Sequence, residues 1–203
     1  MLKISFNDTI VKTSKLINYN EELALSEIKS ELSSVLTKLQ QKAYLIATYD
    51  SIIIDSSHYH AYINLGKTYQ WISLTNKNID EEILSKIGFR DKLYNDRPFN
   101  SKQLKNFFQK IITCYENNGY PFASIRLDSI KINNNKLAAQ LFLDKNKLYK
   151  IDSVLIKGNA RITSQYIKNY IRIKDGDIYN EESIRKISSR INELPFVTEE
   201  KKW

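Results

Sequence analysis

A unit of helix, glycine stop and strand, best formed between residues 100 and 130, constrains this chain more than any other feature. From Leu104 to Tyr115, apolar residues recur every three or four positions, which predicts a helix with one apolar face. Asn100 can cap the start of this helix, and Gly119 suits the left-handed residue that ends it. From Ile125 onward apolar and polar residues alternate, as they do in a half-buried strand.

This unit occurs three times in the sequence. Residues 41–48 align with 117–124 at an offset of 76, and residues 192–197 align with 118–123 at an offset of 74. Asn20, Asn100 and Asn180 recur at intervals of 80, each after an aromatic residue. Such a period is longer than a solenoid repeat and matches the size of a small domain, so we expect tandem modules. In the first module Ala43 takes the place of Gly119, which leaves its helix stop in question.

The fold class predicted is α+β, with tandem β-α-α-β-β modules. Each module has a three-stranded mixed sheet and two helices on one face. The expected modules are 1–66, whose start could be clipped, 67–146, and 147–203, which ends before its last strand. We expect helices at 8–17, 21–42, 80–87, 100–118, 162–171 and 181–192. We expect strands at 2–6, 44–54, 59–65, 68–74, 123–128, 136–144, 149–157 and from 195. Because a sheet that lacks a strand exposes unpaired backbone groups, the polypeptide is expected to continue beyond Trp203.

Charge is spread unevenly along the chain. The net charge is +8, with 0 in residues 1–75, +5 in 76–147 and +3 in 148–203. This excess could attract nucleic acid or an anionic membrane surface, and it is also compatible with an ordinary solvated surface. The sequence has one cysteine, no apolar run of the ~18 residues that a membrane-spanning helix needs, and no signal peptide after Met1.

No pattern of catalytic, metal-binding or cofactor-binding residues stands out. His58 and His60 could supply half of a metal site, but no nearby acidic or cysteine cluster completes it. Cys114 lies on the predicted apolar helix face, as a structural thiol would. Gly66-Lys67-Thr68 lacks the upstream glycine of a phosphate-binding loop. We therefore expect no enzyme activity, no metal and no cofactor.

Three short motifs, taken with the element order, resemble the POTRA (polypeptide-transport-associated) domains of BamA/TamA-type outer-membrane assembly factors. Residues 149–159 look like the first strand of such a domain, which ends at Gly158-Asn159. Residues 174–179 look like the family's link between the two helices, and residues 118–123 look like its entry to the second strand. The motif residues in these segments are Gly119, Tyr120, Gly158, Asn159, Gly176, Asp177 and Tyr179. The resemblance implies a periplasmic location, a membrane β-barrel after this part of the chain, and a signal peptide removed before Met1.

The mechanism expected from such a sheet is pairing of its edge strand with another chain. An extended segment can add to an open edge through main-chain hydrogen bonds that do not depend on its side chains. The predicted edge in the first module is Ala47–Ile52, with Ala47, Thr48, Tyr49 and Asp50 as its binding residues. The predicted edge in the second module consists of Ala123, Ser124, Ile125, Arg126, Leu127 and Asp128. In the second edge, the even-numbered side chains should face away from the helices and Ile125 and Leu127 toward them.

The expected partners of these edges are unfolded outer-membrane proteins, accessory periplasmic or lipoprotein subunits, and the membrane barrel itself. A basic nucleic-acid-binding protein is the alternative, because aromatics such as Tyr120 and Phe122 could stack on bases. A passive spacer arm of the cell envelope is a further alternative. No nucleic acid is expected, since the basic residues do not cluster into a run.

Overall fold

The computed structural model describes residues 2–6, 25–55, 58–155 and 163–194. By their internal contacts the residues group into two compact units. One unit holds 1–76, 90–106 and 127–140, and the other holds 77–89, 107–126 and 141–203. The predicted helix at 8–17 and the predicted strand from 195 lie outside the described residues, as do Gly158 and Asn159.

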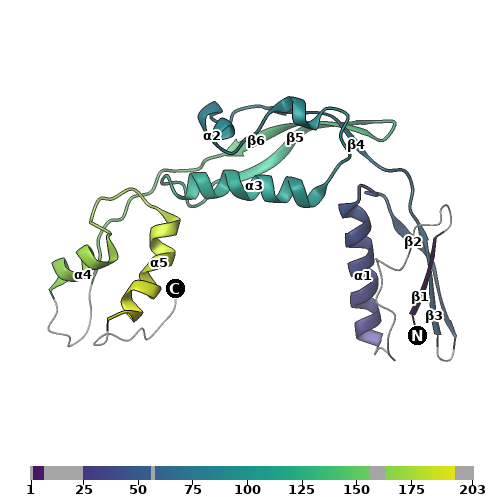
Figure 1. The fold of residues 1–203 in the computed structure, drawn as a ribbon, viewed down its shortest axis with the longest axis horizontal. Coiled ribbons are helices and arrows are strands. Elements are labelled where there is room, and N and C mark those ends of the chain that lie inside the picture. The colour runs from purple at the N-terminus through teal and green to yellow at the C-terminus, as the bar shows by residue number, and fades with distance from the viewer. Residues whose placement is uncertain (1, 7–24, 56–57, 156–162, 195–203) are drawn as a thin grey trace. The chain divides into compact units, whose positions relative to one another are not determined.

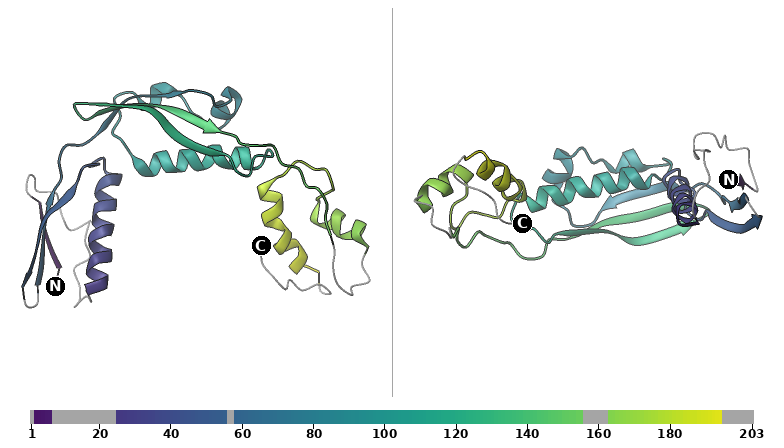
Figure 2. Two further views of the ribbon diagram at one scale, coloured as in Figure 1. Left: turned by 180° about the vertical axis from the view of Figure 1, so that it is seen from behind. Right: turned by 90° about the horizontal axis from the view of Figure 1, so that it is seen from below.

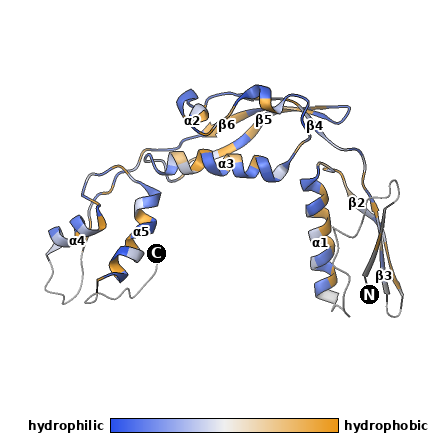
Figure 3. Ribbon diagram, viewed as in Figure 1, coloured by the Kyte–Doolittle hydropathy of each residue, from blue (hydrophilic) through white to orange (hydrophobic). Residues whose placement is uncertain are grey.

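The first sheet contains strands β1 (Leu2–Phe6), β2 (Thr48–Asp55) and β3 (His58–Asn64) in the order β1-β3-β2. β1 runs parallel to β3 and β2 runs antiparallel to it, so the sheet is mixed. Helix α1 (Leu25–Gln41) lies beside this sheet (Figure 1). Polar and apolar residues alternate along the helix, as expected when one face packs inward (Figure 3). The buried core consists of Ile4, Ile28, Leu32, Val35, Leu39, Ala47, Ala61, Ile63 and Leu65.

The second sheet contains β4 (Gln70–Asn76), β5 (Ser124–Asn133) and β6 (Lys136–Asp144) in the order β4-β6-β5. Between β4 and β5 lie α2 (Glu81–Lys86), the 3-10 helix η2 (Asp91–Tyr94) and α3 (Ser101–Glu116). Helix α3 runs along one face of the sheet, as two views show (Figures 1 and 2). Its predicted cap is present, because the Asn100 Oδ1 accepts the Gln103 N–H at 2.9 Å.

Both long helices end in the same way. Gly119 has the predicted positive φ, 94°, and Ala43 takes the equivalent conformation at φ 74°. One residue later in each copy, a backbone N–H closes the turn: Tyr120 donates to the Tyr115 carbonyl at 3.0 Å and Tyr44 to the Leu39 carbonyl at 3.1 Å. The first helix stop therefore needs no glycine, although a left-handed alanine is strained.

The C-terminal described part contains α4 (Ser164–Ile171) and α5 (Glu181–Asn192), which pack around Ile167, Ile171, Ile173 and Leu194. The predicted strand at 149–157 is wrong for residues 149–155, where the structure has only an isolated bridge between Lys150 and Ile178. Here the backbone pairs with a turn about 25 residues away, because Ile151 donates its N–H to the Asp177 carbonyl at 2.8 Å and its carbonyl accepts the Gly176 N–H at 2.7 Å. These backbone groups are therefore satisfied by the turn between α4 and α5.

The predicted α+β class with mixed three-stranded sheets is confirmed. Several boundaries differ from prediction, however. β2 begins at Thr48 and β5 at Ser124, so Ala47 and Ala123 end the preceding turns instead of starting the strands. Residues 91–94, for which no helix was predicted, form η2, and β4 begins at Gln70. None of the described helices is long and apolar enough to cross a bilayer.

Candidate strand-binding edges

Strands β2 and β5 each lie at the end of their sheet's strand order. The predicted edge residues Thr48–Asp50 and Ser124–Asp128 therefore have one side of their backbone directed away from the sheet. Along β5, Ser124 and Arg126 are exposed and Ile125 and Leu127 are half-buried, which follows the predicted alternation. Asp128 departs from it, because its side chain is half-buried. Whether these residues bind a partner remains a prediction.

The other edge of the second sheet is partly covered. At the start of β4, Gln70 forms a bridge with Pro98. On either side of this bridge, Trp71 donates its N–H to the Arg97 carbonyl at 2.8 Å and Phe99 donates to the Tyr69 carbonyl at 3.0 Å. Of the two edges of this sheet, β5 is therefore the better acceptor for an added strand.

A bulge interrupts β2 near its start and changes which residues face the core. The pairing register shifts between Tyr49 and Ser51, so Asp50 is the extra residue. Before the bulge, Tyr49 is opposite Ile63; after it, Ile52 is opposite Ala61. Ala61 and Ile63 are fully buried. Both Tyr49 and Ile52 therefore lie on the helix-facing side, although they are three positions apart. Ile54, opposite Tyr59, continues on the same side.

Strand β5 also contains a backbone irregularity. Its backbone is left-handed at Ser129, where φ is 51°. Asn134 and Asn135, at φ 47° and 65°, form the two-residue turn into β6. This turn sets Ile132 opposite Leu137 and Ile130 opposite Ala139, both of which are buried. Ile130 and Ile132 therefore lie on the same side as half-buried Leu127, with one extra residue between them.

These isoleucines are the most distinctive residues of the two edges. Ile52 lies within the predicted first edge, and the other four lie outside both predicted edges. Their exposed fractions lie between 44% and 64%, which is high for isoleucine. The exposed residues are Ile52, Ile53 and Ile54 in β2 and Ile130 and Ile132 in β5. The signal was present in the sequence, because Asp-Ser-Ile-x-Ile occurs at 50–54 and again at 128–132, 78 positions later.

Cations lie on the opposite face of β5. The Arg126 guanidinium is 4.1 Å from the centroid of the Phe142 ring, and the Lys77 ammonium is 5.1 Å from the same centroid. Phe142 belongs to the central strand β6; Arg126 comes from β5, and Lys77 follows β4 at the other edge.

A hydrogen-bonded group anchors the end of α3. The Tyr115 hydroxyl donates to Asp80 Oδ2 at 2.8 Å, and Lys145 Nζ lies 2.8 Å from the same oxygen. The hydrogen bonds from Lys145 and Tyr115 lower the pKa of the Asp80 carboxyl. Burial, together with the bond to Asp80, raises the pKa of Tyr115. The group therefore ties the end of α3 to Asp80, which precedes α2, and to Lys145, which follows β6.

The motif residues of the C-terminal part have structural roles. Asp177 Oδ2 accepts the Lys174 N–H at 2.8 Å across the turn that contains Gly176, whose φ is 86°. Tyr179 donates its N–H to the Tyr149 carbonyl at 3.0 Å, and its hydroxyl donates to Glu181. Burial and this bond raise the pKa of Tyr179 to about 12. These contacts hold the turn between α4 and α5.

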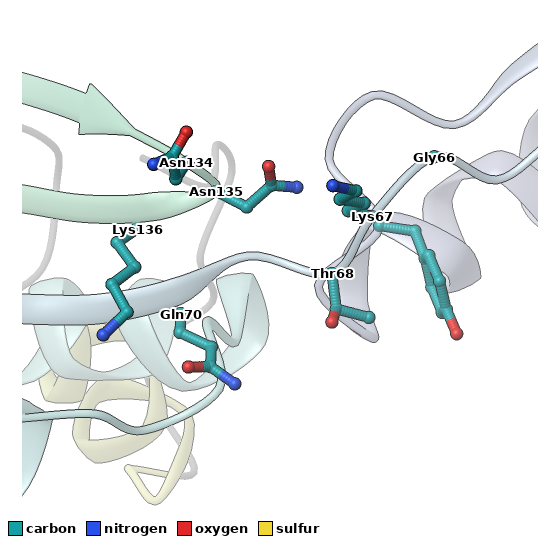
Figure 4. Close-up of a pocket in the computed structure, with 8 residues that line it drawn as sticks. Gly66, Lys67, Thr68, Gln70, Asn134, Asn135 and Lys136 are labelled. Atoms are coloured by element: carbon teal, nitrogen blue, oxygen red, sulfur yellow. The ribbon is translucent and has the colours of Figure 1, made fainter.

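Figure 4 shows an open, polar pocket of about 460 Å³ lined by the segment 66–70, the turn at 134–136 and Tyr44. Among the described residues that line it, Lys67 and Lys136 carry the charge. Lys136 already pairs with Asp96 at 3.5 Å, and we assign the pocket no ligand. In the described ranges, no three His, Cys, Asp or Glu side chains come together as a metal site requires.

Both the sequence and the fold of this chain are similar to those of POTRA domains. The POTRA family model, described as a surface antigen variable number repeat, matches residues 149–199. POTRA domains 3–5 of Haemophilus influenzae BamA superpose with a TM-score of 0.66 at 14% identity, covering 96% of this chain and 84% of that chain.

Haemophilus ducreyi BamA lacking POTRA domains 1–3 gives a TM-score of 0.51 at 9% identity, covering 73% of this chain and 29% of that chain. No curated protein matches the sequence. Residues 149–199 are therefore a POTRA-family segment, and the chain that contains them has the fold of the POTRA domains of BamA-type outer-membrane proteins.

Proposed function

We propose that this chain is a periplasmic POTRA region of an outer-membrane β-barrel assembly or translocation protein. In this role it is a non-catalytic scaffold that binds unfolded outer-membrane proteins or accessory subunits. The observation that carries the proposal is the position of β2 and β5 at sheet edges within a POTRA fold. An extended client segment would add to either edge as a further strand, through backbone hydrogen bonds.

Backbone pairing explains how one surface can serve many clients. The added strand gains its hydrogen bonds whatever its side chains are, so affinity does not require one sequence. The cations over Phe142 and the net charge of +8 add an electrostatic attraction for acidic clients. Nucleic acid would be attracted by the same charge, so the experiment must separate the two ligands.

The test removes backbone donors from β5 while a matched variant keeps them. Ile125→Pro/Leu127→Pro deletes two N–H groups, whereas Ile125→Thr/Leu127→Thr deletes the same apolar side chains and retains the backbone. Binding of a labelled barrel-strand peptide should fall at least about tenfold in the proline variant and much less in the threonine variant. Circular dichroism checks that both variants fold.

Hydrogen exchange keeps the proposal testable if the proline variant fails to fold. Addition of the peptide to the unmodified chain should slow exchange of amides in Ser124–Asp128 and Thr48–Ser51. Unchanged exchange at both edges would overturn the proposal. Steeply salt-dependent binding of single-stranded nucleic acid, without peptide binding, would instead favour the nucleic-acid alternative. Binding of neither ligand would favour a spacer arm.

A further inference from the structure

We infer that Asn118 is a site of spontaneous covalent modification, at which its side-chain amide is converted to aspartate and isoaspartate through attack by the Gly119 nitrogen. Water is the co-reactant. This chemistry does not depend on the proposed function, because it belongs to the turn that ends α3. It would change the covalent structure of that turn as the protein ages.

The residue pair at this turn has the least hindered arrangement for such an attack. Asn118-Gly119 is the only Asn-Gly pair in the chain. Glycine has no Cβ, so its backbone nitrogen is the most accessible and its backbone rotates most freely. The Asn118 side chain is exposed to solvent. Water therefore reaches the reacting carbon, and the side chain has room to turn toward the nitrogen that follows it.

The Gly119 N–H is the nucleophile, and the fold leaves it unbonded. The N–H groups on either side of it both donate to the Tyr115 carbonyl at 3.0 Å. Within the described part of the chain, the Gly119 N–H itself has no acceptor. In the first copy of the helix stop, by contrast, the corresponding Ala43 N–H donates to the Gln40 carbonyl at 3.1 Å. The Gly119 nitrogen is therefore available to react.

The Asn118 amide is held by a hydrogen bond that slows the reaction without preventing it. Its Nδ2 donates to the Cys114 carbonyl at 2.6 Å, which keeps the amide against the last turn of α3. This bond must open before the side chain can meet the Gly119 nitrogen. Because the bond is exposed, water replaces it at a small cost in free energy. The folded chain should therefore react at Asn118 only somewhat more slowly than the unfolded chain.

The reaction balances with water alone. The Gly119 nitrogen gives its proton to solvent and bonds to Asn118 Cγ, while the Cγ–Nδ2 bond breaks and ammonia leaves. The product is a cyclic succinimide. Water then adds to either ring carbonyl, and the ring opens to aspartate or to isoaspartate. In isoaspartate the backbone runs through the former side chain, so the turn is longer by one carbon.

Both products would loosen the end of α3. A carboxylate here cannot donate to the Cys114 carbonyl, and it lies at the negative end of the helix dipole. The longer backbone of isoaspartate would also displace two bonds: the one from the Tyr120 N–H to the Tyr115 carbonyl, and the one from the Tyr149 N–H to the Gly119 carbonyl. Modification would therefore weaken the helix stop and its bond to the segment that follows β6.

A second pair in the chain provides an internal control. Asp175-Gly176 is the only Asp-Gly pair, and such pairs form the same succinimide with loss of water. Here the Gly176 N–H donates to the Ile151 carbonyl at 2.7 Å. The Asp175 carboxylate accepts from Lys168 at 2.5 Å and from the Val154 N–H at 3.0 Å. Both reacting groups are held, so the fold should protect this pair far more strongly.

The test follows the full chain at pH ~8, folded and in urea, by mass spectrometry of tryptic peptides. Peptide 111–126 should gain about 1 Da, and its fragment ions should place the change at Asn118 rather than Asn117. This conversion should be only about fivefold slower in the folded chain than in urea, since one exposed hydrogen bond opens. Isomerisation at Asp175, detected by an isoaspartate-specific methyltransferase, should be slowed more than about a hundredfold.

The variant Asn118→Gln is the chemical control, because its longer side chain disfavours ring closure and peptide 111–126 should keep its mass. The inference is overturned if Asn118 stays intact in the folded chain while it converts in urea, or if another asparagine of the folded chain converts first. Equal protection of Asn118 and Asp175 by the fold would also overturn it, because the unbonded Gly119 N–H would then have no effect.

Discussion

Gly119→Ala tests whether the turn that ends α3 packs closely against the segment that follows β6. Gly119 ends the turn after α3 at φ 94°, and its carbonyl accepts the Tyr149 N–H at 2.8 Å. A Cβ added at Gly119 would lie 2.5 Å from Leu148 Cδ1 and 2.8 Å from Ile178 Cγ2. The substitution therefore introduces both a strained backbone and a steric overlap.

The two costs can be estimated separately. A left-handed residue with a Cβ costs about 1–2 kcal/mol. The overlap adds about 1 kcal/mol, near the lower limit for overpacking, because Leu148 and Ile178 are half-exposed and their side chains can rotate away. Gly119→Ala should therefore lower the free energy of unfolding by about 2–3 kcal/mol. Gly88→Ala is the matched control, since Gly88 has φ 78° and open space around its added Cβ. It should cost only about 1–2 kcal/mol.

Urea denaturation followed by far-UV circular dichroism measures the free energy of unfolding of the Gly119→Ala and Gly88→Ala variants. Each unfolding transition is fitted separately. Leu148→Ala removes the atom closest to the added Cβ. The free energy that Gly119→Ala costs in the Leu148→Ala background should therefore be smaller than its cost in the unmodified chain, and closer to the cost of Gly88→Ala. Equal losses for Gly119→Ala and Gly88→Ala would refute the packing argument. A loss at Gly119 that Leu148→Ala leaves unchanged would assign the whole cost to the backbone.

Three further changes test local features. Tyr49 donates its hydroxyl to the Leu32 carbonyl at 2.6 Å, and burial raises its pKa to about 12. Because the fold keeps this phenol neutral, its stabilisation is full below pH ~10 and is lost as the pH rises toward 12. Tyr49→Phe should therefore lower the free energy of unfolding by about 1 kcal/mol at pH 8 and by less at pH 11, as measured by thermal unfolding. A loss of the same size at both pH values would contradict this. Arg172→Gly should raise stability by about 1 kcal/mol in urea melts, because this exposed residue ends α4 at φ 58°, and a loss would contradict the strain argument. Asn100→Ala should cost about 1 kcal/mol through the lost bond to the Gln103 N–H, whereas Asn100→Asp should retain most of the stability.

Sequence patterns predicted those features that depend on a single residue's conformation or on helical periodicity. Asn100 and Gly119 take their places because a helix start needs a side-chain acceptor and its end needs a left-handed residue. The bounds of α5 and β6 also agree with the prediction, since a helical face and a strict alternation are both local patterns.

Features that depend on pairing between distant segments were harder to predict from the sequence. The predicted strand at 149–157 has the right alternation, yet Ile151 pairs with the turn at Gly176 and Asp177, so residues 149–155 hold only a bridge. The bulges were missed because an alternation rule assumes an uninterrupted pleat, and a left-handed serine at 129 has no compositional signal. Only the repeat of Asp-Ser-Ile-x-Ile marks both places.

The bulges and the exposed isoleucines are best understood together. An edge strand with Ile52, Ile53 and Ile54 in succession is a hazard, because two copies of a flat apolar edge can pair with each other. The bulge at Asp50 leaves one residue without a place in a regular ladder, and the left-handed backbone at Ser129 distorts β5 locally. Two bulged edges cannot pair continuously with each other, whereas an unfolded client can adjust its backbone to either one. The same irregularity that breaks the alternation in the sequence would thus let an apolar edge remain open to clients and closed to its own copies.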